Sequence, residues 1–239
     1  HFAAAQTCYG RLRQGGAWPT LAETAAESAR TATDPWVRAV SWLHVGLARL
    51  RLSDPKAATE ALAKSREPFA ASPGALRLRA PDGAVFEWLA SWGWAECPPE
   101  RRAEARDVLL DAIGFQPHAV FDAFVEARDL LTPEALADLR ALLEKVPSDD
   151  DAQLARAMLL AAFARDGAPA DLFAAAERRV LAKLQSAEGN PARWLGYLAL
   201  LARAQGDDDR FRRAYAVYLD QPRRPVSLDA LLAETASRK

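Results

Sequence analysis

The sequence predicts an all-α fold, and three observations support that prediction. Strong helix formers, mainly alanine, leucine, arginine and glutamate, fill long segments of the 239-residue chain. Breaks that contain proline or glycine separate these segments and leave roughly 12 to 18 residues between them, a typical helix length. No run of alternating β-branched and aromatic residues is bounded by turn pairs, so the sequence offers no candidate strand.

Several predicted helices begin at residues that suit a helix N-terminus. Asp34, Asp54 and Thr132 each precede a proline, and proline is favoured at the first helical position because its missing N–H would have no partner there. An acidic run follows Ser148, and its carboxylates suit the cap and first turn of a helix. Residues 36–51 carry apolar side chains at helical spacing, which predicts an amphipathic helix with one buried face.

A pattern of small residues recurs along the chain with the same internal spacing. Two units share a large apolar residue, a glycine, a small residue and a leucine in equal register: Trp42, Gly46, Ala58 and Leu62, and Leu89, Gly93, Ala105 and Leu109. Small residues at such positions let two helices cross closely. The pattern resembles the tetratricopeptide repeat, a helix-turn-helix unit of about 34 residues.

The resemblance implies a right-handed α-solenoid of about five to six degenerate repeats, which forms a single domain over 1–239. The repeats are expected at 2–35, 36–73, 82–117, 118–148, 150–190 and 191–222. Further helix crossings are expected at Ala127, Ala161 and Ala199, and an inserted loop is expected at 72–82. Segment 227–237 is expected to form a C-terminal helix that covers the last apolar face, as such arrays require.

Charge and composition give no sign of a nucleic-acid or membrane partner. The chain has 31 basic and 32 acidic residues, whereas nucleic-acid binders carry an excess of basic residues. No stretch reaches about 20 uninterrupted apolar residues, so membrane insertion is not expected. Two cysteines suit a reducing compartment, and the bias toward arginine and alanine indicates a bacterial source, so we expect a cytoplasmic protein. Because the chain begins with His1, we expect that a native N-terminal segment is missing.

The sequence has no evident pattern for catalysis, so no enzyme activity, cofactor or metal site is predicted. The histidines His1, His44 and His118 form no metal-binding spacing with one another or with the cysteines. Glycine-rich phosphate loops and a GxSxG turn are missing. Two acidic runs, Asp149–Asp151 and Asp207–Asp209, could bind Mg²⁺ in a helical enzyme, but their place at predicted helix starts favours capping.

The resemblance implies a concave groove lined by the first helix of each repeat. The residues expected to face it are His44, Leu47, Ser91, Trp94, Arg193, Tyr197, Leu200 and Arg203. The family's lysine–asparagine clamp for a C-terminal carboxylate is not matched at these positions, so the expected ligand is an apolar peptide or an amphipathic helix. Trp94 is the expected anchor, and packing of Trp88, Trp92 and Trp94 inside the array is the open alternative.

The resulting functional prediction is a protein–protein interaction, scaffold or docking module. It would bind another protein or a peptide in an apolar concave groove. Two alternatives stay open: a sensor domain that binds a small molecule or a signalling peptide, and, ranked last, a helical enzyme or a subunit of one.

Overall fold

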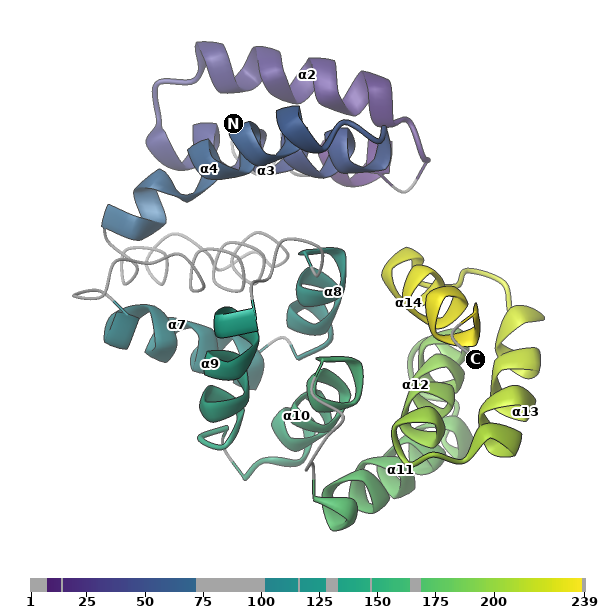
Figure 1. Cartoon of the computed structure of the whole chain (residues 1–239). Helices are drawn as coiled ribbons and strands as arrows, with labels where there is room; N and C mark the ends of the chain where they lie inside the picture. Colours follow the sequence, from purple (N-terminus) through teal and green to yellow (C-terminus); the bar gives the residue numbers. More distant parts are fainter. Residues whose placement is uncertain are drawn as a thin grey trace. The chain divides into compact units, whose positions relative to one another are not determined.

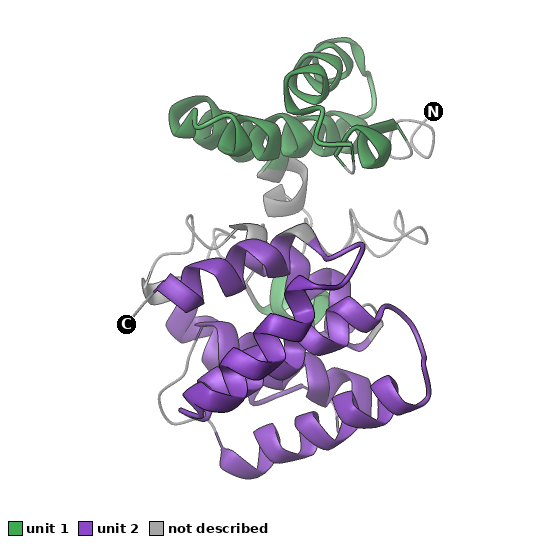
Figure 2. Ribbon diagram, turned by 90° about the vertical axis from the view of Figure 1, so that its right-hand side faces the viewer, with its two compact units in different colours: residues 1–109 green, residues 110–239 purple. Residues whose placement is uncertain are grey.

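The protein is helical throughout the part of the chain that the structure describes. The structure is a computed structural model that describes residues 8–13, 15–71, 102–115, 117–127, 133–146, 148–163 and 169–237. Every regular element among these residues is a helix, which confirms the all-α prediction. The chain divides into two compact units, 1–109 and 110–239, which are coloured separately in Figure 2. The solenoid arrangement and the predicted single domain stay predictions.

Unit 1 is organised around α3, which contacts both α2 and α4 (Figure 1). Its labelled helices are α2 (Trp18–Thr31), α3 (Pro35–Arg51) and α4 (Pro55–Ala71), and residues 8–13 are also helical. Gly46 of α3 lies so close to α4 that a Cβ atom there would come within 2.4 Å of Leu62 Cγ. Ala58 and Leu62 of α4 are buried beside it, so this pair packs through the small residues that the sequence singled out.

Unit 2 contains a closed ring of helix contacts. Its helices are α8 (Pro117–Ala127), α9 (Pro133–Leu143), α10 (Asp150–Phe163), α11 (Ala170–Gln185), α12 (Pro191–Ala204), α13 (Asp208–Leu219) and α14 (Val226–Ser237). Helix α8 contacts α10, α10 contacts α12, α12 contacts α14, and α14 contacts α8 again. Helix α7 (Arg102–Phe115) spans the division between the two units.

Local capping explains where these helices begin. Asp34 accepts hydrogen bonds from the Trp36 and Val37 amides at 2.8 and 3.4 Å, and Asn190 accepts one from the Ala192 amide at 3.0 Å. Each of these caps precedes a proline at the first helical position. Since such caps satisfy amides that have no partner within the helix, the helix starts follow directly from the local sequence.

The predicted repeat ranges coincide with pairs of helices where the structure describes them. The ranges 36–73, 118–148, 150–190 and 191–222 each hold two helices, and α14 occupies the range predicted for the final helix. In the range 82–117, only α7 lies among the described residues.

The turns of α3–α4 and α12–α13 are alike in detail. The amide of Asp54 donates to the Arg49 carbonyl at 2.9 Å, and the amide of Asp207 donates to the Ala202 carbonyl at 3.0 Å. The residue before each aspartate has a positive φ, 58° at Ser53 and 76° at Gly206. Two helical hairpins in different units therefore share one turn conformation.

Candidate functional site

His44 and Leu47, two of the predicted groove residues, lie in the core of unit 1. Both are on α3, and they expose 7% and 4% of their surface. The His44 ring lies 4.7 Å from the Tyr9 ring, and its Nδ1 lies 2.9 Å from the Val40 carbonyl oxygen. Burial lowers the pKa of His44 to about 4, so the imidazole is neutral at physiological pH. In this position His44 acts as a packed, hydrogen-bonded core residue.

Two other predicted groove residues, Ser91 and Trp94, lie outside the described residues. The same holds for Trp88, Trp92 and the loop expected at 72–82. The role of Trp94 as an anchor therefore stays a prediction.

A polar network of five side chains links α8, α12 and α14 in unit 2. Asp122 of α8 accepts hydrogen bonds from Arg193 Nη1 at 3.1 Å, from Arg193 Nη2 at 2.8 Å and from Ser227 Oγ at 2.8 Å. Arg193 also donates to Tyr197 Oη at 3.3 Å, and His118 Nδ1 lies 3.1 Å from the same oxygen. Its hydrogen bond between Asp122 and Ser227 joins side chains 105 positions apart in the sequence.

The polar network is largely enclosed. Tyr197 exposes 1% of its surface and Leu200 none, and the side chains of Arg193 and Asp122 expose 18% and 23%. Burial raises the pKa of Tyr197, so its hydroxyl stays protonated. Burial, helped by the charge of Arg193, lowers the pKa of His118 to about 4. At neutral pH the network thus consists of one ion pair among uncharged partners.

Arg203, also predicted to face the groove, lies near the C-terminal end of α12. Its guanidinium pairs with Asp208 and lies 5.7 Å from the ring centroid of Phe211. Four of the six described groove residues are thus buried and the two arginines are ion-paired. The structure places this set inside helix packing, and contact between these residues and a partner stays a prediction.

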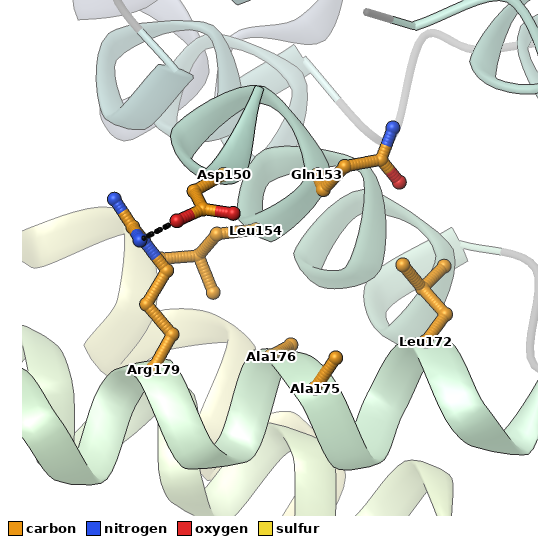
Figure 3. Close-up of a pocket in the computed structure, with 7 residues that line it drawn as sticks. All are labelled: Asp150, Gln153, Leu154, Leu172, Ala175, Ala176 and Arg179. Carbon is orange, nitrogen blue, oxygen red and sulfur yellow. Dashed lines mark hydrogen bonds and ion pairs between the residues drawn. The ribbon is translucent and has the colours of Figure 1, made fainter. Parts of the chain in front are cut away.

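A surface cavity lies between α10 and α11, the two helices of the predicted repeat 150–190. It has a volume of about 180 Å³ and is lined by Asp150, Gln153, Leu154, Leu172, Ala175, Ala176 and Arg179. Figure 3 shows Ala175 and Ala176 along one side of α11, with Leu154 on the other helix and the Arg179–Asp150 ion pair at one end. The cavity therefore combines apolar walls with a charged rim.

The first acidic run, Asp149–Asp151, lies at the charged end of the cavity, and its side chains form ion pairs and a helix cap there. Arg179 pairs with Asp150 at 2.7 Å and with Asp151 at 2.6 Å. Asp149 caps α10 by accepting hydrogen bonds from the amides of Asp151 and Ala152 at 2.8 and 3.1 Å. The side chains of Asp150 and Asp151 remain 81% and 52% exposed. The charged residues that line the cavity, Asp150 and Arg179, thus form an ion pair at its end, with Asp151 beside them.

The second acidic run also begins a helix. Asp207 accepts a hydrogen bond from the Arg210 amide at 2.9 Å and caps α13. Asp208 pairs with Arg203, and Asp209 pairs with Arg212 at 3.4 Å. Both runs therefore have the capping role that the sequence favoured.

The described residues hold no cluster of three or more His, Cys, Asp or Glu side chains placed to bind a metal ion. Within the same part of the chain, no single helix is long and apolar enough to cross a membrane; the segments 103–114 and 117–125 reach that length and composition only as a pair bent by 118°. Comparisons with protein-family models, with curated proteins and with solved structures find no match. Functional inference therefore rests on the geometry of the chain itself.

Sequence reasoning identified part of the polar network and missed the rest. Arg193 and Tyr197 were singled out, but Asp122 lies 71 positions from Arg193 and has no local signal of its role. Gly196 was also missed, although a glycine inside an apolar helix costs about 1 kcal/mol relative to alanine and so indicates close packing. A Cβ atom at Gly196 would lie 2.3 Å from Leu228 Cδ2.

Proposed function

We propose that the protein is an interaction module that binds a side chain of a partner protein in the cavity between α10 and α11. The observation that carries this proposal is the pairing of apolar walls with an exposed, charged rim in one cavity. Apolar walls favour burial of a hydrophobic side chain, by about 25 cal/mol for each Å² removed from water. Charged rims add orientation and selectivity more than affinity.

The size of the cavity favours a partner side chain over a free small molecule. Its volume of about 180 Å³ is smaller than the roughly 300–1,000 Å³ typical of small-molecule sites. One leucine or phenylalanine side chain, presented on a peptide or a helix, suits this volume better. Protein binding is for this reason our choice over the small-molecule sensor.

The charged rim of the cavity indicates which type of residue should lie next to the apolar anchor in the partner. Asp150 and Asp151 remain largely exposed although both pair with Arg179, so two carboxylates at this end of the cavity stay accessible to a partner. A lysine or arginine next to the apolar anchor would complement these carboxylates. Because exposed ion pairs contribute only about 0–1 kcal/mol, we expect the basic residue to tune selectivity and the apolar anchor to supply most of the affinity.

Selection of random peptides displayed on phage, with the full chain as bait, tests the proposal directly. We expect enriched peptides to combine a large apolar residue with lysine or arginine. Ala175→Trp fills the cavity from an exposed position on α11 and should weaken binding of these peptides at least about tenfold. Ala216→Trp makes the same change at an exposed position on α13 and should leave binding unchanged.

Two results would contradict the proposal. One is equal binding of the enriched peptides to the unsubstituted chain and to a folded Ala175→Trp variant. The other is a selection in which the unsubstituted chain enriches no more peptide than the Ala175→Trp variant does.

A further inference from the structure

Helix α14, in yellow in Figure 1, covers a face of unit 2 that is formed by α8 and α12. Its buried residues form a single stripe: Ser227, Leu228, Leu231, Leu232 and Thr235. Ala233 and Ala236, on its other side, are exposed. Helix α14 thus lies on the α8–α12 face in the way that an amphipathic ligand helix lies in a groove.

Two features of the α8–α12 face receive α14. Gly196 of α12 leaves a notch, because a Cβ atom there would lie 2.3 Å from Leu228 Cδ2 and 3.0 Å from Tyr218 Cε2. Leu228 fills this notch. Asp122 of α8 accepts the hydrogen bond from Ser227 Oγ. A helix that presents a hydroxyl residue followed at once by leucine therefore matches both features.

The face retains its own interactions when α14 is removed. Asp122 keeps both hydrogen bonds from Arg193, and Tyr197 keeps its contacts with Arg193 and His118. Breaking a buried network is costly mainly when a charge is left without a partner. Removal of α14 takes away only the hydroxyl of Ser227 from this network, so the exposed face stays internally paired.

The connection that leads into α14 is strained in the docked position. Arg223 lies between Pro222 and Pro225 and has a φ of 58°. This left-handed conformation is unfavourable for a residue with a side chain. A helix supplied by another molecule would occupy the face without this connection.

A buried hydroxyl group, that of Tyr218, also lies near α14. Tyr218 is fully buried, and the carboxylate of Asp229 on α14 lies beside its hydroxyl. Burial raises the pKa of Tyr218, and the nearby carboxylate of Asp229 adds to the rise. That carboxylate accepts a hydrogen bond from Arg224 Nε at 2.9 Å. Asp229 of α14 therefore lies between Tyr218 and Arg224.

We propose that the α8–α12 face is a second binding surface, and that its occupant in a complex is an amphipathic partner helix with the pattern Ser/Thr-Leu-x-x-Leu-Leu. Helix α14 covers this face in the free chain and leaves it when the partner helix binds. The face includes Arg193 and Tyr197, which the sequence placed in a groove. The inference does not rest on the cavity between α10 and α11, which is lined by other residues.

The test uses a fluorescent synthetic peptide with the sequence of residues 225–237 as the probe and the full chain as the receptor. Leu228→Asp in the chain places a carboxylate in the apolar notch and should undock α14. We expect this variant to bind the probe at least about tenfold more tightly than the unsubstituted chain, because its competing helix is gone. A probe that carries the same change should not bind. Ala233→Asp, on the exposed side of α14, should match the unsubstituted chain.

Hydrogen exchange of the unsubstituted chain gives a second, independent readout. We expect the amides of α14 to exchange at least about tenfold faster than those of α12, because α14 opens without the rest of unit 2. Equal protection of the two helices would overturn the proposal, and so would a Leu228→Asp variant that keeps its helical circular dichroism but binds the probe no more tightly. If that variant does not fold, hydrogen exchange alone decides. Ala175→Trp should leave probe binding unchanged, which separates this inference from the proposed function.

Discussion

The α3–α4 hairpin of unit 1 and the α12–α13 hairpin of unit 2 have the same turn but different surroundings. Counted back from that turn, His44 and Tyr197 occupy equivalent positions, as do Val40 and Arg193, since 197 − 44 and 193 − 40 both equal 153. His44 bonds within its own helix, to the Val40 carbonyl. Arg193 instead reaches Asp122 on α8. One backbone plan therefore supports a histidine that bonds within its own helix in unit 1 and an arginine that depends on another helix in unit 2.

The largest expected effect comes from removing the carboxylate at the centre of the polar network. Asp122→Ala leaves Arg193 without its ion-pair partner in an enclosed site and should lower the free energy of unfolding by about 3 kcal/mol. Asp122→Leu combined with Arg193→Met should recover most of this loss, because both charges leave together. Urea denaturation followed by circular dichroism measures both. A loss below about 1 kcal/mol for Asp122→Ala would mean that water replaces the carboxylate.

A pH effect of intermediate size should come from one buried histidine in each unit. The histidine of an unfolded chain binds a proton near pH 6.5, whereas folded His44 binds one only near pH 4. Its contribution to stability is therefore complete above pH 6.5 and is lost as the pH falls toward 4. Between about pH 7 and pH 5 this amounts to about 2 kcal/mol.

His44→Asn tests this assignment, since the asparagine amide can still donate to the Val40 carbonyl. Urea denaturation at several pH values should show about half the pH dependence of the unsubstituted chain. The remaining half is expected from His118, whose pKa is also lowered to about 4. An unchanged pH dependence would rule out His44 as a source.

The smallest expected effect concerns the close contacts at one glycine of α3 and one glycine of α12. Gly46→Ala forces a Cβ atom against Leu62, and Gly196→Ala forces one against Leu228, so each should cost about 1 kcal/mol after the gain in helix propensity. Gly114→Ala is the control, because a Cβ atom there meets nothing within 4 Å; this change should stabilise the chain slightly. In a Leu62→Ala background, Gly46→Ala should become favourable. Destabilisation that persists in that background would mean that the contact with Leu62 is not the cause.

Features with a local chemical signal could be predicted from the sequence, and those formed by distant residues could not. Predicted pairs beginning at 36 and 191 correspond to helices beginning at 35 and 191, because Asp34, Asn190 and the prolines after them act on the nearest amides. The final helix was also predicted. Its contact with α8 was not, since the Ser227–Asp122 hydrogen bond joins residues 105 positions apart.

Contacts between distant residues also explain why the predicted groove residues are buried. The resemblance placed His44 and Tyr197 on an open face, and periodicity within one helix cannot reveal which distant segment covers that face. In the structure, Tyr9 packs against His44, and residues of α8 pack against Tyr197. The cavity between α10 and α11 was missed for a similar reason, because its walls come from alanines and leucines that look like ordinary helix residues.

The sequence separation of Asp122 and Ser227 has a consequence for synthesis of the chain. At roughly 5–20 residues per second, the ribosome needs about 5–20 seconds to add the 105 positions that separate them. Helices form within about a microsecond, so α8 and the helix α10 that packs on it can form before α14 exists. Every nascent chain therefore passes through an interval of seconds in which α8 is complete and uncovered, and a chaperone or partner that acts at the ribosome meets the protein before α14 can compete.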